Sequence, residues 1–335
     1  MNFLITGGAG FIGSHLTERL IGEGHTVTVL DDLSTGSREN LSVLVDHPGW
    51  RFIQGTVLNR PLVQAQVAAC DQVVHLAAAV GVHTILEQPL SSLKTNVDGT
   101  DSVLSACAEF RRPVLLASTS ETYGKNSTGA LCEDADSILG PSSIVRWSYA
   151  TAKKLDEFLG LAYHATYGVP VTITRFFNIA GPRQSARYGM VLPAFVRAAL
   201  AGEPIRVFGD GAQSRNFTYI DDCIDALLRL LRNAAAAGKI VNIGSEEEVS
   251  IYALAERVKQ AAGSSSPIVI IPYQEAYPEG GFEDMRRRVP CICRIEALTG
   301  WRPATNLASI IEKTILFERA RQGDPALTPE WTLAR

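Results

Sequence analysis

Two residues four positions apart, Tyr149 and Lys153, are the first candidates for chemistry in this sequence. A helix is predicted from Trp147 to Tyr167, so both side chains project from one face of it. A phenol has an ordinary pKa of about 10, too high for a base at neutral pH. A neighbouring ammonium group stabilises the phenolate and lowers that pKa. The pair predicts a tyrosine base activated by a lysine, although the same spacing also occurs on solvated helix faces.

A second candidate site is the segment GGAGFIG, which holds Gly7, Gly10 and Gly13. It lies between a predicted strand, 2–6, and a predicted helix, 12–22. The first glycine allows a tight turn, the second lets a pyrophosphate approach the backbone, and the third lets helix pack against strand. The free amides at the helix start attract phosphate groups. A lone glycine pattern is often only a flexible loop, but this placement predicts a dinucleotide site.

The residue that selects the dinucleotide is Asp31, in VLDDL. It closes the second predicted strand, 26–30, about 20 residues after the glycine loop, as expected for this kind of site. A carboxylate accepts hydrogen bonds from a ribose 2′-hydroxyl and repels a 2′-phosphate. The nearest arginine that follows is Arg38. The sequence therefore favours NAD over NADP.

The elements that position these residues alternate between strands and helices, which predicts a parallel sheet covered on both faces. From Gly181 onward the chain is richer in glycine, proline and short strands, while a helix near 222–233 and a strand at 239–244 look like returns to the first domain. The predicted fold class is α/β, a doubly wound parallel sheet of the Rossmann type with a smaller interleaved carboxyl-terminal domain. Further strands are predicted at 51–55, 72–76, 113–118 and 169–177, and a further helix at 93–110. The NAD-binding domain is expected to span 1–180 plus about 216–245, and the nucleotide-sugar-binding domain 181–215 and 246–325.

Composition excludes several classes of protein. Hydrophobic residues make up 46% and charged residues 20% of the 335, and the net charge of −4 favours neither nucleic acid nor an anionic membrane. The chain shows no signal-peptide pattern, and its apolar runs are shorter than the roughly 20 residues of a membrane span. The six cysteines are scattered, and the pair Cys291 and Cys293 lacks the second pair that a zinc site needs. We expect a cytoplasmic protein with free thiols and no metal.

With these pieces in place, the sequence resembles the extended short-chain dehydrogenase/reductase family of NAD-dependent epimerases and dehydratases. The resemblance covers nearly the whole chain. It implies an enzyme that uses NAD to oxidise C4 of a nucleotide-linked sugar transiently. The matching segments are TGGAGFIGSHL, VLDDLSTG, HLAA, TNVDGT, STSETYG, YATAKK, RFFNIAGPRQ and GDGAQSRNFTYIDD.

The resemblance also implies roles for individual residues. Thr119 should bind the sugar 4-hydroxyl, Tyr149 should take its proton, and Lys153 should hold the nicotinamide ribose. His75 falls in a cofactor-lining segment, although a core histidine is an equally good interpretation. Relatives usually carry Asp near the end of the third strand, where this chain has Thr56, so weaker adenine contact is expected. The full set of expected cofactor contacts is Gly7, Gly10, Phe11, Ile12, Gly13, Asp31, Asp32, Thr56, Val57, Leu76, Ala77, Ala78, Asn96, Tyr149 and Lys153. The expected substrate contacts are Ser120, Arg146, Asn178, Arg183, Arg215 and Arg288, with Asn178 and Arg215 on the diphosphate.

The reaction that follows oxidation depends on the triplet Thr119, Ser120 and Glu121. In 4,6-dehydratases the pattern at these three positions resembles T-D-E, and the Asp is the acid that expels the 6-hydroxyl. In 4-epimerases the two residues after the Ser or Thr are usually small and uncharged. The triplet T-S-E is similar to that of UDP-glucuronate decarboxylases. Arg146 and Arg288 also match arginines of those decarboxylases, although a charge at a helix start and a solvated run, MRRRVP, are the competing interpretations.

The decarboxylase resemblance implies a complete reaction. Oxidation at C4 places a ketone β to the C6 carboxylate, and Thr119 and Tyr149 stabilise the enolate left when carbon dioxide departs. Arg288 or a water then protonates C5, and Glu121 orients the ring or that water. We therefore expect UDP-glucuronate to become UDP-xylose. The alternative is a UDP-hexose or UDP-hexuronate 4-epimerase, and a 4,6-dehydratase is less favoured. A regulator that binds NAD without catalysis is disfavoured, because such proteins typically lack the tyrosine that this chain has as Tyr149. By resemblance alone, helices near 93–110 and 147–167 should pair into a four-helix bundle in a homodimer.

Overall fold

A computed structural model describes residues 1–127, 129–185, 190–277 and 283–323. Within these residues, seven parallel strands form the central sheet in the order β11-β6-β5-β4-β1-β2-β3. The strands are β1 (Asn2–Thr6), β2 (Thr26–Asp31), β3 (Trp50–Gln54), β4 (Gln72–His75), β5 (Val114–Thr119), β6 (Val171–Phe176) and β11 (Lys239–Ile243). In the middle of the sheet β4 is buried along its whole length, as expected for a parallel sheet covered on both faces.

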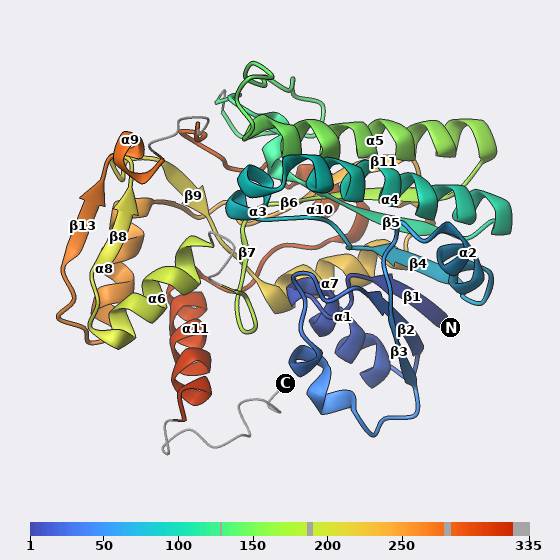
Figure 1. Ribbon diagram of the computed structural model, residues 1–335, viewed down its shortest axis with the longest axis horizontal. Coiled ribbons are helices and arrows are strands. Elements are labelled where there is room, and N and C mark those ends of the chain that lie inside the picture. The colour runs from blue at the N-terminus through green and yellow to red at the C-terminus, as the bar shows by residue number, and fades with distance from the viewer. Residues whose placement is uncertain (128, 186–189, 278–282, 324–335) are drawn as a thin grey trace.

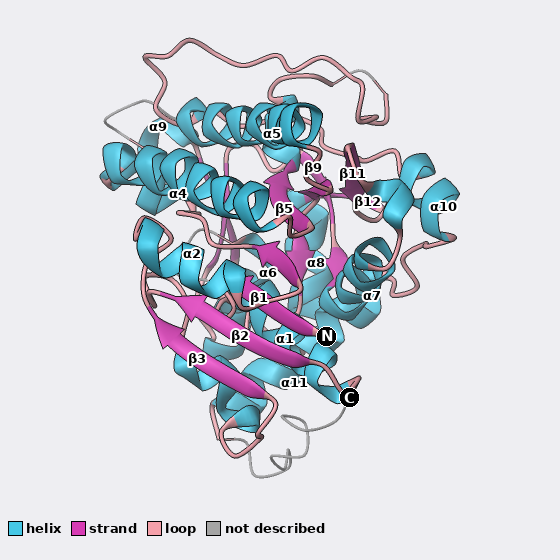
Figure 2. Cartoon of the chain, turned by 90° about the vertical axis from the view of Figure 1, so that its right-hand side faces the viewer, coloured by secondary structure: helices cyan, strands magenta, loops and turns pink. Residues whose placement is uncertain are grey.

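Helices cover both faces of this sheet (Figures 1 and 2). On one face lie α2 (Arg60–Ala68), α4 (Pro89–Phe110) and α5 (Trp147–Tyr167), with α4 packed along α5. On the other face lie α1 (Phe11–Gly22) and α7 (Ile220–Leu231), which pack against each other. Among the described residues, no helix is both long and apolar enough to span a membrane.

A smaller lobe lies beside the sheet, at the left of Figure 1. Its parallel pair is β8 (Ile205–Phe208) with β13 (Ile268–Ile271). Helices α6 (Val191–Ala201) and α8 (Ile251–Ala261) pack against β8, and α11 (Leu307–Arg321) packs against these two helices. Short strands border it: β7 (Ile179–Ala180) pairs with β10 (Thr218–Tyr219), and β9 (Ser214–Asn216) pairs with β12 (Glu248–Ser250). The remaining short helices are α3 (Val82–Glu87), α9 (Tyr273–Ala276) and α10 (Cys293–Thr299).

The predicted fold class is confirmed. The expected return of the chain to the first domain is visible in β11, which pairs with β6 at the sheet edge, and in α7 against α1. In the first half of the chain the 3₁₀ segment Arg38–Leu44, α2 and α3 were not predicted. In the second half the helices of the smaller lobe and its border were not predicted either, namely α6, α8, α9, α10 and α11. Helix α4 begins at Pro89 rather than near Leu93, because proline is suited to the first turn. The last two residues of the expected sugar-binding domain, 324–325, lie outside the described residues.

Candidate functional site

The glycine loop between β1 and α1 brings backbone very close to backbone. Gly7 has φ +72°, in the left-handed region that favours glycine. A Cβ on Gly13 would lie 2.3 Å from the carbonyl oxygen of Gly7, so any side chain there would push the loop apart. Gly10 caps α1 without a side-chain hydrogen bond, and the first turn holds no acidic residue. The amides at the start of α1 are therefore suited to bind phosphate groups.

Asp31, at the end of β2, stiffens this loop. Its Oδ2 accepts from the Ala9 amide at 2.9 Å and its Oδ1 from the Leu33 amide at 2.8 Å. Burial raises the pKa of the Asp31 carboxyl above its ordinary value, but two amide donors favour the charged form. Arg38, the nearest arginine along the chain, lies over the Phe52 ring, 4.5 Å from its centre. The arrangement fits a ribose hydroxyl better than a 2′-phosphate.

A cleft of about 1330 Å³ runs from the glycine loop to the smaller lobe. Its walls come from the carboxyl ends of the sheet strands on one side and from the smaller lobe, including Phe208 and Tyr273, on the other. The carboxyl ends of strands in an open α/β sheet are where such folds bind ligands. Of the expected cofactor residues, the cleft is lined by Gly7, Gly10, Phe11, Ile12, Gly13, Asp31, Asp32, Val57, Leu76, Ala77, Ala78, Tyr149 and Lys153.

Two expected cofactor residues, Thr56 and Asn96, do not line this cleft in the described structure. The Thr56 hydroxyl accepts from the Leu58 amide at 3.3 Å and so belongs to a turn after β3. Asn96 is 1% exposed, and its side chain binds the amide and carbonyl of Ala79 at 2.7 and 3.2 Å. Asn96 thus holds the loop after β4 from behind.

His75 lies in the core rather than in the cleft. Its ring nitrogens contact the hydroxyls of Thr6 at 2.7 Å and Thr100 at 3.2 Å. Burial and the nearby Lys153 charge lower the pKa of His75 to about 3, so the ring is neutral at physiological pH. The interpretation as a core histidine is the one that the structure favours.

At the end of β5, Thr119 and Tyr149 face each other in the cleft. Their hydroxyl groups are hydrogen-bonded, and the Thr119 hydroxyl also accepts from the Glu121 amide at 3.2 Å. Ser120, the first residue after the strand, is 1% exposed and lines the cleft, and its Oγ has no hydrogen-bond partner among the described residues. An unpaired buried hydroxyl is costly in a folded protein. These three side chains are therefore placed to bind a polar ligand group.

The lysine of the predicted pair does not activate the tyrosine as the spacing suggested. Lys153 Nζ is 2.8 Å from Asp156 Oδ2, and both side chains are almost fully buried. Burial raises the pKa of Tyr149, and the Glu121 and Asp156 carboxylates raise it further. The pKa of Tyr149 thus departs from its ordinary value in the direction opposite to the expected one, and the charge of Lys153 is paired with Asp156.

Glu121 lies between two arginines. Its carboxylate is hydrogen-bonded to Arg146, and its Oε1 is 3.7 Å from Arg288 Nη1. Burial alone would raise the pKa of Glu121, but the Arg146 and Arg288 charges hold it below its ordinary value. Burial and the nearby Arg215 lower the pKa of Arg288 to about 10. Neither arginine is a solvated surface charge, since Arg146 is 4% and Arg288 8% exposed.

The remaining predicted substrate residues also line the cleft. Arg215 is held by Asp284 at 2.7 Å, and Asn178 accepts from Arg288 at 2.9 Å. Arg183 pairs with Glu18 at 2.6 Å. Among the described residues, the ion pairs of Arg146, Arg215 and Arg288 are with the carboxylates of Glu121 and Asp284, so three positive charges there face two negative ones. The region is suited to bind an anionic ligand.

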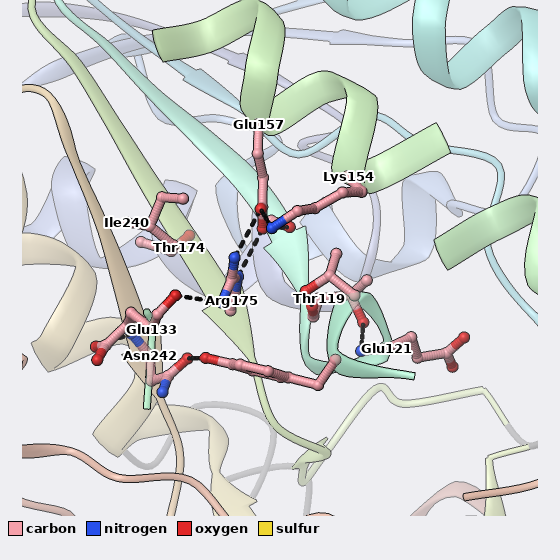
Figure 3. Close-up of polar contacts among 12 residues, drawn as sticks. Thr119, Glu121, Glu133, Lys154, Glu157, Thr174, Arg175, Ile240 and Asn242 are labelled. Atoms are coloured by element: carbon pink, nitrogen blue, oxygen red, sulfur yellow. Dashed lines mark hydrogen bonds and ion pairs between the residues drawn. The ribbon is translucent and has the colours of Figure 1, made fainter. Parts of the chain in front are cut away.

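A buried polar network lies behind these residues (Figure 3). Glu157 on α5 accepts two hydrogen bonds from Arg175 on β6, at 2.7 and 2.8 Å, and one from Ser118 on β5 at 2.6 Å. Arg175 also donates to the Glu133 carbonyl at 3.0 Å. Because Ser118 precedes Thr119, the network fixes the end of β5 relative to the helix that carries Tyr149.

Sequence reasoning missed Asp156, Asp284 and Glu157. Asp156 and Glu157 lie three and four positions after Lys153 on one helix, so helical spacing could have placed Asp156 beside the lysine. Asp284 is 69 positions from Arg215 along the chain, and no local signal links the two.

The comparisons with known proteins agree with this geometry. The model of the "NAD dependent epimerase/dehydratase family" matches residues 3–244. A UDP-N-acetyl-alpha-D-glucosaminuronate decarboxylase of Bacillus cytotoxicus is 41% identical over 96% of this chain and 98% of its own length. UDP-glucuronic acid decarboxylase 1 of Xenopus tropicalis is 34% identical over 94% of this chain and 72% of its own length.

Solved structures show the same fold. The UDP-glucuronic acid 4-epimerase of Bacillus cereus, solved with UDP-glucuronic acid and NAD, superposes with a TM-score of 0.87 at 28% identity, covering 96% of this chain and all of its own. A dTDP-glucose 4,6-dehydratase of Streptomyces venezuelae, solved with NAD, gives 0.86 at 30% identity over 97% and 99% of the two chains. The glycine loop, the free amides at the start of α1 and Asp31 fit the cofactor that this family uses. The chain belongs to the NAD-dependent epimerase/dehydratase family, and its cofactor is NAD.

Proposed function

We propose that this enzyme decarboxylates a UDP-linked hexuronate, namely UDP-glucuronate, and yields UDP-xylose. The observation that carries the proposal is the position of Glu121, held between Arg146 and Arg288 next to Thr119 and Tyr149. Two buried arginines are suited to receive a sugar carboxylate, which a neutral hexose would not offer. The relatives named as decarboxylases support the same reaction.

The chemistry requires a proton acceptor at C4 and an oxyanion site. NAD, which the glycine loop and Asp31 would hold, would supply the acceptor for the C4 hydride and its later return. Tyr149 takes the 4-hydroxyl proton, and Thr119 positions that hydroxyl. The resulting ketone is β to the carboxylate, so the C5–C6 bond breaks as carbon dioxide leaves and its electron pair enters an enolate. Hydrogen bonds from Thr119 and Tyr149 stabilise the enolate oxygen.

The enolate must then gain a proton at C5. Arg288 is a candidate donor because its pKa is lowered to about 10, closer to neutral pH than that of an ordinary guanidinium. Glu121 holds this arginine, or an ordered water, in place. Ser120 stands where a dehydratase carries its acid, so loss of the 6-hydroxyl is not favoured.

Two specific observations favour other substrates or outcomes. The relative that is 41% identical acts, by its name, on an N-acetylated hexuronate, which makes UDP-N-acetylglucosaminuronate a second candidate substrate for the same decarboxylation. The structural likeness to a UDP-glucuronic acid 4-epimerase favours 4-epimerisation as a second candidate reaction.

A substrate panel separates these candidates. The purified protein is incubated with NAD and, separately, with UDP-glucuronate, UDP-N-acetylglucosaminuronate and UDP-glucose. We expect UDP-glucuronate to lose carbon dioxide and UDP-glucose to remain unchanged. Turnover of the N-acetylated substrate alone would replace UDP-glucuronate in the proposal. An isomeric product of unchanged mass would support the epimerase, and loss of water from UDP-glucose would support a dehydratase.

We also propose the domain division and the assembly. The described sheet with α7 and β11 would bind NAD, and the smaller lobe would bind the nucleotide sugar. A homodimer would form through α4 and α5, which lie side by side at one surface (Figure 1). Its support is the exposed apolar side chains on these helices, Leu90, Leu155 and Phe158, of a kind that interfaces cover. A cytoplasmic location fits an enzyme of free nucleotide sugars.

A further inference from the structure

Three cysteines from two distant segments meet at one surface, and the proposed reaction uses none of them. Cys132 and Cys293 are exposed, and Cys291 is partly exposed. The Cys291 thiol shares side-chain hydrogen bonds with Cys132 and with Cys293. The remaining cysteines of the chain are buried.

The backbone explains why Cys132 and Cys291 are neighbours. Leu131 and Pro290 form a parallel β-bridge. The Leu131 amide donates to Val289 at 2.8 Å, and the Cys291 amide donates to Leu131 at 3.0 Å. The two cysteines are the next residues along these paired segments. Paired strands lie about 4.7–4.9 Å apart, and a disulfide needs Cα atoms about 4.4–6.8 Å apart, so the bond fits this backbone.

One core residue holds the two segments together. The Asn242 side-chain amide donates to the carbonyls of Leu131 at 2.8 Å and Cys291 at 3.1 Å. Its Oδ1 accepts a hydrogen bond from the Tyr123 hydroxyl at 2.8 Å, and this bond is drawn at Asn242 in Figure 3. Asn242 is fully buried. The backbone positions of the two cysteine-bearing segments are therefore fixed by a core residue and not only by contacts at the surface.

The segment that carries Cys291 also carries Arg288. Arg288 lies in the cleft against Asn178 and Glu121, while Val289 and Ile292 on either side of Cys291 are buried. A covalent bond at Cys291 would therefore restrain the backbone three residues from Arg288.

A metal centre does not explain the cluster. Across the ranges that the structure describes, no group of three or more His, Cys, Asp or Glu side chains is arranged to hold a metal ion. The hydrogen bond between Cys132 and Cys291 raises the pKa of the Cys132 thiol to about 11. The Cys132 thiol is therefore protonated at rest, which distinguishes it from a cysteine that is held as a thiolate nucleophile.

We propose that Cys132 and Cys291 form a reversible disulfide under oxidants and thereby fasten residues 285–291 to residues 130–133. A peroxide oxidises the exposed Cys132 to a sulfenic acid and is reduced to water. The Cys291 sulfur then attacks that sulfur, the S–S bond forms, and the sulfenic oxygen leaves as a second water with the Cys291 proton. Cys293 lies on the same segment as Cys291, so a bond between these two would fasten nothing.

Thiol counting and peptide mapping test the bond. The reduced full-length protein is treated with hydrogen peroxide, its free thiols are counted and alkylated, and the linked peptides are identified by mass spectrometry. We expect two thiols to disappear, a link between Cys132 and Cys291, and full recovery with dithiothreitol. Cys132→Ser should keep all of its thiols unlinked, and Cys293→Ser, the matched control, should still form the bond.

Amide hydrogen exchange tests the restraint without relying on the proposed reaction. Exchange in residues 285–292 should slow several-fold in the oxidised wild-type protein and should not change in Cys132→Ser. A link between Cys291 and Cys293, or no link, overturns the proposal. Formation of the expected link with unchanged exchange overturns the claim that the bond fastens the Arg288 segment.

Discussion

At the scale of residues, the proposed catalytic pair Tyr149 and Lys153 has a third residue beside it, Asp156. The lysine and the aspartate form a buried pair with Nζ and Oδ2 2.8 Å apart. The Asp156 charge also acts on Tyr149, whose pKa lies above the ordinary value because of burial, Glu121 and Asp156. The tyrosine is therefore a protonated phenol hydrogen-bonded to Thr119 at rest, and it must lose its proton to act as a base.

Replacing Tyr149 with Phe removes the proposed proton acceptor while keeping the ring. General base catalysis supplies roughly 10²–10⁴-fold in rate, so kcat should fall by about that factor. NAD affinity, measured by calorimetry, should change little in comparison. A variant with nearly normal turnover would place the base elsewhere.

Replacing Asp156 with Asn should shift the titration of Tyr149 to lower pH. The Asp156 charge disfavours the phenolate, and its removal stabilises that form, so the tyrosine ionises more readily. The acidic limb of the pH profile of kcat should therefore move to lower pH. The tyrosinate absorbance of Tyr149, obtained by subtracting the spectrum of a Tyr149→Phe protein, should also appear at lower pH in Asp156→Asn than in the wild type. Asp225→Asn, which changes an exposed carboxylate on α7, is the control. An unmoved profile would remove Asp156 from this role.

At the scale of elements, the active site depends on how three of them are joined. Glu157 on α5, Arg175 on β6 and Ser118 on β5 form one buried network, and Arg175 also lies over the Tyr123 ring, 4.6 Å from its centre. Charged groups this deeply buried are stable only when they are paired. The network therefore helps to hold β5 and α5 in their relative positions.

Arg175→Met should destabilise the fold strongly, because it leaves the buried Glu157 carboxylate without its bidentate partner. Loss of one member of a buried pair costs about 3–5 kcal/mol of unfolding free energy. Asp225→Asn, which breaks the exposed pair with Arg229, should cost at most about 1 kcal/mol. Urea titration measures both. Equal losses would mean that the Arg175 network contributes no more than a surface pair.

Elements with strong local patterns could be predicted from the sequence, and others could not. The limits of α5, Trp147–Tyr167, agree with the prediction, and the glycine loop lies where its motif placed it. The helix α2 was missed although Asn59 caps it and a proline stands in its first turn. Partners that pack from far along the chain, such as Asp284 on Arg215, depend on the folded topology and leave no local pattern.

At the scale of the molecule, the cleft runs between the sheet domain and the smaller lobe, while α4 and α5 form an outer surface (Figures 1 and 2). Phe158 on α5 is 62% exposed and Leu155 is 44% exposed. If this surface is the dimer interface, Phe158→Glu should bury a charge without a partner and should yield monomers. Light scattering after size exclusion reads the mass. Leu58→Glu, which changes an exposed leucine after β3, should not alter it, and a Phe158→Glu dimer would contradict the proposed interface.

The most direct test of the proposed decarboxylation is the mass spectrum of the product made from UDP-glucuronate in deuterium oxide. Departure of carbon dioxide leaves C5 as an enolate carbon that must take its new hydrogen from solvent, by way of Arg288 or a water. The predicted product is a UDP-pentose that lacks one carbon dioxide and carries one carbon-bound deuterium at C5. A UDP-hexuronate of unchanged carbon skeleton, without deuterium, would contradict the account and assign the site to epimerisation.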